Sequence, residues 1–269
     1  QTPAQNSTSI LGFINVPSVT LPQVTFPTFT ADKKRRITNS QVDFFIGRDF
    51  LVVLHDGMLT SINDIFSFCQ KTLRKRTELM EKGPGFLFYR LVDSLVDNCF
   101  PVINEISSSI DKIDRGLETT QSGKILEEIS TTRRNIVVFH TMIKPLLPLF
   151  KQLEEGKFKS LNDNLIPFWE NISDHLQKIW DRLEDNKELI EGLALSNESF
   201  LATRTNEIVK FLTIITAIAF PFIIINNLYS MNIVGLPGAQ EPWIVWFFFG
   251  LIFIASGIII FFFKFRRWL

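Results

Sequence analysis

The sequence predicts an α+β chain whose charged aqueous part is followed by two C-terminal transmembrane helices. The chain has 269 residues, with 28 basic and 28 acidic side chains. Residues 1–205 carry 24 of the basic and 26 of the acidic side chains, and two long uncharged segments follow them. A formal net charge of zero argues against a nucleic-acid-binding protein, which needs a basic surface. Two cysteines are too few for a disulfide framework.

Runs of β-branched and aromatic residues predict strands in the N-terminal part. Residues 10–16 and 19–26 alternate apolar and polar side chains, which is the period of a strand with one buried face. Residues 42–46 and 50–55 are richer in Val, Ile and Phe, and only a Gly-Arg-Asp sequence separates them. This last pair is therefore predicted to form a β-hairpin.

From residue 60 onward the apolar spacing becomes helical. One candidate helix covers residues 62–82 and ends at the Gly-Pro-Gly sequence of residues 83–85. A second begins near Phe86 and continues towards Leu117, with apolar residues three and four apart. A third covers roughly residues 122–153, and a turn is expected near residues 155–159.

The segment 167–228 is predicted to be one uninterrupted helix. Its 62 residues would rise about 93 Å at 1.5 Å each. Gly192 is tolerated inside a helix at a cost of about 1 kcal/mol, and Pro221 should kink the helix without ending it. A helix of this length needs lateral packing, against the preceding helices or against copies of itself.

Two uncharged segments have the composition of membrane spans. Residues 243–263 are 21 uncharged residues and residues 211–228 are 18, against the roughly 20 that cross the hydrocarbon core. The alternative is a buried pair of core helices. Lys and Arg flank both segments, whereas the connection 229–242 has neither. The positive-inside rule then places both termini in the cytoplasm and the connection outside.

Polar residues in the first span follow a heptad seam. Such a pattern faces neighbouring helices in a bundle, because polar groups inside a membrane are costly unless they meet protein or water. The seam is interpreted either as the lining of a wet pore shared by several subunits or as helix–helix contacts without conduction. Its two rows, each with a spacing of seven, are Asn206, Thr213, Phe220, Asn227 and Val209, Thr216, Ile223, Ser230.

The stretch 206–232 closely resembles the first span of the CorA-type divalent metal ion (magnesium/cobalt) transporter family. That family ends this span with Tyr-Gly-Met-Asn, and here Tyr229, Ser230, Met231 and Asn232 occupy the four places. Further matches are residues 41–55, the Gly-Pro sequence at residue 83 with residues 89–93 after it, Pro221 and the terminal residues 264–269. Serine at position 230 departs from the family signature.

The resemblance implies a funnel-shaped homopentamer whose first-span helices line a pore, with residues 1–40 as the remainder of an αβα domain. Tyr229, Ser230, Met231 and Asn232 would form the selectivity filter, where Asn232 holds a hydrated Mg²⁺ through its first water shell. Mg²⁺ dehydrates reluctantly, so recognition of the aquo-ion is chemically reasonable. The residues implied to line or gate the pore are Asn206, Leu212, Thr213, Thr216, Phe220, Ile223 and Asn227, and Glu241 lies in the external loop.

These expectations give six regions and a location in the cell (inner) membrane as a multi-pass protein. The expected partners are further copies of the chain, the lipid bilayer and divalent cations, with no nucleic acid. Residues 1–60 would be a partial cytoplasmic α/β domain, 61–205 a cytoplasmic helical stalk region, 206–228 the pore-lining transmembrane helix, 229–242 an external loop with the signature, 243–263 the second transmembrane helix and 264–269 a basic cytoplasmic tail.

An acidic run precedes the first span. Residues 163–191 contain eight carboxylates against three basic side chains, which is usual for a solvated helix face. The family resemblance adds a second interpretation, in which stalk carboxylates bind Mg²⁺ and hold the pore shut. Glu170 and Asp174 are the candidates for such a regulatory site.

The predicted function is a channel that passes divalent cations, Mg²⁺ foremost, down the electrochemical gradient. Alternatives are a zinc-type or exporting relative with the same fold, and a non-conducting membrane-anchored scaffold. An enzyme is not expected, because the three histidines are far apart and no HExxH, Cys-x-x-Cys, glycine-rich phosphate loop or nucleophile elbow is present. No catalytic cofactor is therefore expected.

Overall fold

The computed structural model describes residues 19–20, 24–29, 36–117, 122–158, 163–231 and 242–265. Its chain divides into two units, Gln1–Leu195 and Ser196–Leu269, and the boundary falls inside one helix. The strand predicted over residues 10–16 lies outside the described residues. The six-region division expected from the sequence stays a prediction.

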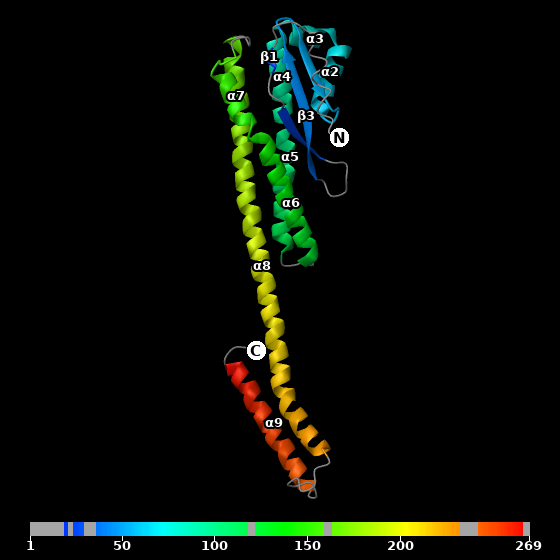
Figure 1. The fold of residues 1–269 in the computed structure, drawn as a ribbon, viewed down its shortest axis with the longest axis vertical. Coiled ribbons are helices and arrows are strands. Elements are labelled where there is room, and N and C mark those ends of the chain that lie inside the picture. The colour runs from blue at the N-terminus through cyan, green and yellow to red at the C-terminus, as the bar shows by residue number, and fades with distance from the viewer. Residues whose placement is uncertain are drawn as a thin grey trace. The chain divides into compact units, whose positions relative to one another are not determined.

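A small antiparallel sheet opens the first unit (Figure 1). The central strand β3 (Ile37–Ile46) pairs with β1 (Val19–Thr20), β2 (Val24–Phe29) and β4 (Leu51–His55). In β3 the apolar side chains of Ile37, Val42, Phe44 and Ile46 are buried, whereas Gln41 is exposed. The predicted hairpin is confirmed, since Val42 pairs with His55 and Ile46 with Leu51.

Helices follow the sheet to the end of the described chain. Each of the three helical segments predicted between residues 62 and 153 is divided in two, whereas the long helix predicted over 167–228 is continuous. The helices are α2 (Thr60–Lys71), α3 (Leu73–Met80), α4 (Pro84–Asp97), α5 (Cys99–Gly116), α6 (Ser122–Ile143), α7 (Leu146–Glu154), the short 3₁₀ helix η2 (Asp163–Leu165), α8 (Ile166–Ser230) and α9 (Pro242–Phe265).

The unpredicted breaks have local causes. Thr72, between α2 and α3, is extended at φ −130° and ψ 106°, and it stands in a run of like charges that weakens a continuous helix. Asn98 separates α4 from α5 because Pro101 has no N–H to donate and its ring crowds the carbonyl four residues earlier. Pro145 separates α6 from α7 in the same way.

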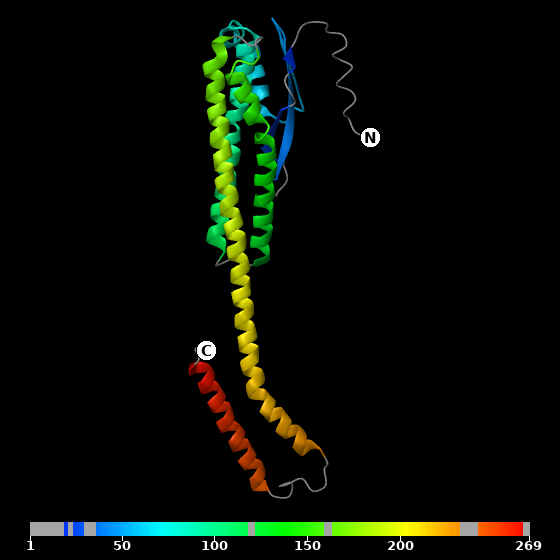
Figure 2. The ribbon, with the colours of Figure 1, turned by 60° about the vertical axis from the view of Figure 1, so that its left-hand side comes forward.

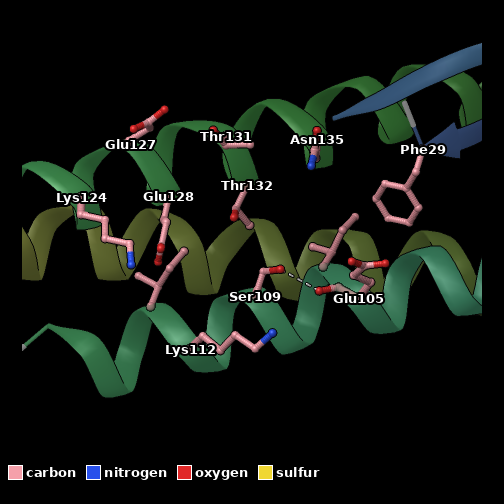
Figure 3. A pocket seen from close by; sticks show the side chains of 12 residues that line it. Phe29, Glu105, Ser109, Lys112, Lys124, Glu127, Glu128, Thr131, Thr132 and Asn135 are labelled. Atoms are coloured by element: carbon pink, nitrogen blue, oxygen red, sulfur yellow. Dashed lines mark hydrogen bonds between the residues drawn. The ribbon is translucent and has the colours of Figure 1, made fainter. Parts of the chain in front are cut away.

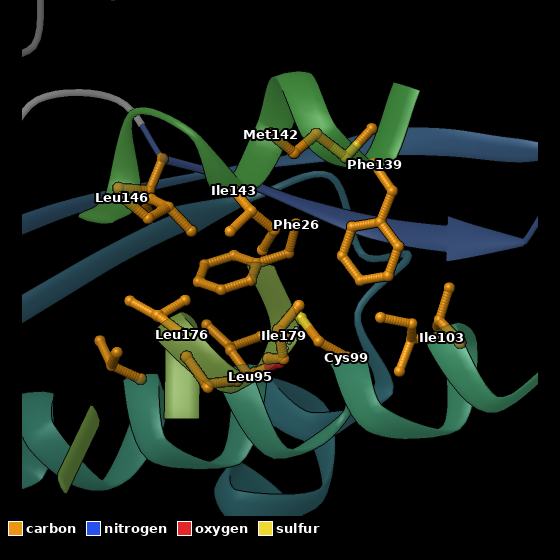
Figure 4. Packing of buried hydrophobic residues seen from close by; sticks show 14 of the residues in the cluster. Phe26, Leu95, Cys99, Ile103, Phe139, Met142, Ile143, Leu146, Leu176 and Ile179 are labelled. Atoms are coloured by element: carbon orange, nitrogen blue, oxygen red, sulfur yellow. Dashed lines mark hydrogen bonds between the residues drawn. The ribbon is translucent and has the colours of Figure 1, made fainter. Parts of the chain in front are cut away.

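The apolar core of the first unit lies between the sheet and the helices α4, α5, α6 and the beginning of α8. Figure 4 shows side chains from all these elements directed into one space. The initial part of α8 is therefore a core helix of this unit. Labelled members of the cluster are Phe26 of β2, Leu95 of α4, Cys99 and Ile103 of α5, Phe139, Met142 and Ile143 of α6, Leu146 of α7, and Leu176 and Ile179 of α8.

Alanine substitutions at two glycines should change the free energy of unfolding in opposite directions. Gly83, before Pro84, has φ 89° and ψ 171°, a region open essentially to glycine alone, so Gly83→Ala should destabilise the fold by about 1–3 kcal/mol. Gly192 lies inside α8, and a Cβ there meets nothing within 4 Å, so Gly192→Ala should stabilise it by about 0.5–1 kcal/mol. Urea titrations of the full chain measure both changes. If both variants were stabilised, or both destabilised, at least one of these two backbone explanations would be wrong.

Three helical stretches in the described residues are long and apolar enough to cross a membrane: Gly123–Glu154, Ile166–Asn227 and Trp246–Phe265. The most apolar window of the first is 44% buried, because α6 and α7 supply core residues to the first unit. The windows of the other two are 0% and 12% buried. Burial thus accounts for the apolar character of Gly123–Glu154, and two membrane spans stay a prediction.

Candidate functional site

The second unit consists of the C-terminal part of α8 and the returning helix α9, which runs back beside it (Figures 1 and 2). One side of α8 carries its least exposed residues in this part. Ile214 is 9% exposed, and the ring of Phe222 lies 6.5 Å from that of Phe249 on α9. On α9, Ile252 is only 3% exposed. The packed side of α8 is thus the side that bears Ile214 and Phe222.

The predicted seam lies on the other side of α8. At about 100° per residue, Thr213, Thr216, Phe220 and Ile223 fall between about 100° and 180° around the helix axis from Ile214. All described seam residues are exposed, including Phe220 at 58% and Ile223 at 53%. Among the residues that the structure describes, none from the same chain covers this face. The same holds for the other predicted pore residues, Asn206, Leu212 and Asn227.

The seam hydroxyls are oriented by the backbone of their own helix. Thr213 Oγ1 donates to the Val209 carbonyl at 2.7 Å, Thr216 Oγ1 to the Leu212 carbonyl at 2.8 Å, and Ser230 Oγ to the Asn226 carbonyl at 2.6 Å. Each hydroxyl hydrogen is therefore used inside the helix. What these oxygens offer to the exposed side is acceptor lone pairs.

The predicted filter is described only in part. Helix α8 continues through Tyr229 to Ser230, and the backbone N–H of Met231 donates to the Asn227 carbonyl at 3.2 Å. Met231 is 57% exposed. Asn232 and Glu241 lie outside the described residues, so their predicted roles stay predictions.

The structure does not bring the regulatory candidates into a site within one chain. Glu170 and Asp174 are both exposed on α8. Among the described residues, no group of three or more His, Cys, Asp or Glu side chains is placed to hold a metal ion.

Next to this surface, His175 Nδ1 lies 3.5 Å from Asp97 Oδ1. Burial, and then the neighbouring Asp97 carboxylate, raise the pKa of Asp93 above its ordinary value.

A cavity of about 340 Å³ between α5 and α6 contains none of the predicted site residues (Figure 3). Phe29 stands at one end, and Lys112, Lys124, Glu105 and Glu128 mix both signs of charge around it. Its lining holds no histidine or cysteine that would pair as a base with a nucleophile. The cavity gives no reason to place chemistry there.

Sequence reasoning did not identify the polar contact between His140 and Glu184. His140 on α6 meets Glu184 on α8, with Nε2 and Oε1 2.6 Å apart, although the two residues are 44 positions apart in the chain. In the sequence, Glu184 belongs to an acidic run typical of a solvated face. Nothing in the local pattern pairs it with a histidine.

Comparison with known proteins identifies similar chains over almost the whole length. The family model described as CorA-like Mg²⁺ transporter protein matches residues 20–267. The cobalt/magnesium transport protein CorA of Thermotoga maritima is 24% identical over 243 residues, which are 90% of this chain and 68% of that protein. The CorA of Methanocaldococcus jannaschii is 22% identical, over 90% of this chain and 75% of its own.

Solved structures share the fold. The complete structure of the CorA magnesium transporter from Methanocaldococcus jannaschii superposes with a TM-score of 0.77 at 17% identity, covering 98% of this chain and 86% of that one. At this identity the likeness concerns the fold alone. A helix-rich chain with an N-terminal sheet, an aqueous part and an apolar helical part is therefore confirmed.

Proposed function

Because the chain belongs to the family of CorA-like Mg²⁺ transporter proteins, we propose that it is a membrane channel for hydrated Mg²⁺. The predicted family is thereby confirmed, and so is the prediction that the chain is a transporter of divalent cations and not an enzyme. The proposal adds the ion, the pore and the direction: Mg²⁺ moves down its electrochemical gradient through a pore lined by α8 of each subunit. The membrane potential supplies about 2.3 kcal/mol per charge per 100 mV, and twice that for Mg²⁺.

The observation that carries this proposal is the exposed polar seam of α8, opposite its packed side. An exposed row of Thr and Asn in an otherwise apolar helix is costly in lipid, which favours a position against water. Its hydroxyl oxygens face outward as acceptors, and the water molecules of a hydrated cation are donors. Mg²⁺ keeps its waters more firmly than most ions, so this lining suits it.

A pore of this kind requires several copies of the chain around one axis. We propose a homopentamer in the inner cell membrane, with both termini cytoplasmic and Asn232 selecting the hydrated ion at the outer end. Tyr229, Ser230 and Met231 would complete the filter, and Phe220 with Leu212 would form apolar constrictions. The aromatic side chains of α9, such as Trp246 at 77% and Phe253 at 78% exposed, would face lipid.

The test is Mg²⁺ uptake into liposomes that contain the full chain, with and without Asn232→Ala. Loss of the carboxamide removes hydrogen bonds to the ion's water shell, so flux or selectivity should fall about tenfold. A competition series with Co²⁺, Ni²⁺ and Zn²⁺ separates a magnesium channel from a zinc-type relative. Wild-type flux and selectivity in the variant would remove Asn232 from the filter, and absence of any flux would favour a scaffold.

Regulation by Mg²⁺ through Glu170 and Asp174 is proposed only between subunits, because both carboxylates are exposed and, among the described residues of one chain, belong to no group of three or more metal-ligating side chains. Raising Mg²⁺ should then slow proteolysis of the first unit in the assembled protein. The double variant Glu170→Gln, Asp174→Asn should lose this protection. Equal cleavage of the wild-type protein with and without Mg²⁺ would contradict a regulatory site here.

A further inference from the structure

The contact between His140 and Glu184 joins two helices of the first unit. His140 Nε2 on α6 lies 2.6 Å from Glu184 Oε1 on α8, and its ring lies 4.0 Å from that of Trp180, tilted by 39°. Side-chain exposure is 22% for His140 and 42% for Glu184. The other carboxylate oxygen of Glu184 is 3.4 Å from Lys187 Nζ. One imidazole thus meets a carboxylate at its edge and an indole at its face.

A carboxylate and an indole face each interact more strongly with a charged imidazolium than with a neutral imidazole. An imidazolium makes a charge-assisted bond to a carboxylate, which is about twice as strong as a neutral one. A cation over an indole face gains further from the ring quadrupole. The hydrogen bond from His140 holds the pKa of Glu184 below its ordinary value, so this carboxylate stays ionised at neutral and mildly acidic pH.

The surroundings of the pair are mixed in charge on both helices. The third helix of this bundle, α5, meets α8 through Ser107 and Asn186, which exchange hydrogen bonds of 3.1 and 3.0 Å. It also meets α8 through Asn104, whose Oδ1 accepts a hydrogen bond from the Arg182 guanidinium at 2.9 Å. The sheet side of α6 is apolar around Phe26 (Figure 4). The charged residues beside the pair by helical spacing are Asp181, Lys187, Glu188 and Glu191 on α8, and Arg133 and Lys144 on α6.

We propose that the His140–Glu184 pair is a proton-dependent tie between α6 and α8, strong when the imidazole is protonated and weak when it is neutral. Histidine is the side chain type that changes charge within the range of pH 5 to 8, so the tie is tested by comparing pH 6 with pH 8. The polar seam lies on the same helix, α8. Protonation of His140 therefore changes how firmly the seam-bearing helix is held to α6. Both residues of the tie lie in the first unit, so the tie forms whether or not the protein conducts ions.

Hydrogen exchange of the full chain in lipid nanodiscs, at pH 6 and pH 8, tests the tie. After correction for the intrinsic pH dependence of exchange, peptides over residues 136–143 and 179–187 should be about fivefold less protected at pH 8. His140→Arg keeps a permanent cation and should remove this pH dependence. His140→Gln should give the weaker protection at both pH values.

The matched control is His55→Gln. His55 accepts a hydrogen bond from the Gly57 N–H through Nδ1, far from α8 in the chain, and the variant should retain the wild-type pH dependence. Equal protection of the wild-type peptides at both pH values would overturn the proposal. The same holds if His140→Gln kept the wild-type pH dependence. Hydrogen exchange does not measure ion flux. Either of these results would therefore leave the channel proposal untouched, and only flux measurements test it.

Discussion

Replacing Trp169 with alanine is expected to lower the free energy of unfolding by about 3–5 kcal/mol. Trp169, near the start of α8, is 1% exposed and is among the largest fully buried side chains of the described residues. Its ring lies 5.3 Å from that of Phe88, 5.9 Å from Tyr89 and 6.2 Å from Phe150. Alanine would leave a cavity among α4, α7 and α8 that rigid neighbouring rings cannot refill. A urea titration of the full chain in detergent, followed by circular dichroism, measures the loss.

Phe168 is the matched control, because it is the neighbouring aromatic residue on the same helix. It is 37% exposed, although its ring lies 4.8 Å from Tyr89. Phe168→Ala should therefore cost only about 1 kcal/mol. Equal losses for the two variants would mean that the first part of α8 is not anchored in the core by Trp169.

The hairpin and the long helix were predictable because their signals are local. Residues 42–46 and 50–55 are rich in Val, Ile and Phe and are separated only by a Gly-Arg-Asp sequence, a pattern typical of a β-hairpin. Between Pro167 and Pro221 only Gly192 interrupts the helical pattern, and one glycine costs less than a helix break. In both cases the local preference and the tertiary packing agree.

The helix breaks were missed because each depends on which of two local preferences is stronger. Pro101 and Pro145 are tolerated in the first turn of a helix as readily as they interrupt one, so their position inside an apolar pattern was ambiguous. At Thr72 the apolar spacing continues on both sides of an extended residue. The run of like charges around Thr72 weakens a continuous helix, and α2 also packs against α4, which the spacing does not reveal.

The sequence predicts which residues of the candidate site share one face of α8, but not whether that face is packed or exposed. The spacing of Thr213 and Phe220 places them on one face, whichever partner that face has. That α9 packs beside Ile214 and Phe222, and not over the seam, needed the structure. The pair of His140 and Glu184 joins helices that sequence spacing does not relate, so no period in the sequence reveals it.

Replacing Thr216 with lysine is expected to reduce divalent cation flux at least about 100-fold. In the proposed channel each subunit would contribute one ammonium group to the same level of the pore. At a distance of about 8 Å and an effective dielectric constant of about 20, each raises the energy of a doubly charged ion by about 4 kcal/mol. Rings of Lys or Arg select anions for the same reason. Mg²⁺ uptake into liposomes, at equal amounts of inserted protein, measures the loss.

Two further substitutions at Thr216 separate charge from a general disturbance of the helix. Thr216→Ser keeps a hydroxyl that donates to the Leu212 carbonyl and should keep most of the flux, since the outward acceptor is retained. Thr216→Val keeps the shape and removes the acceptor, so flux should fall to a value between those of serine and lysine. If lysine at this position left Mg²⁺ uptake intact in protein that inserts and assembles normally, the seam would not line the ion pathway, and its Thr and Asn residues would serve helix packing alone.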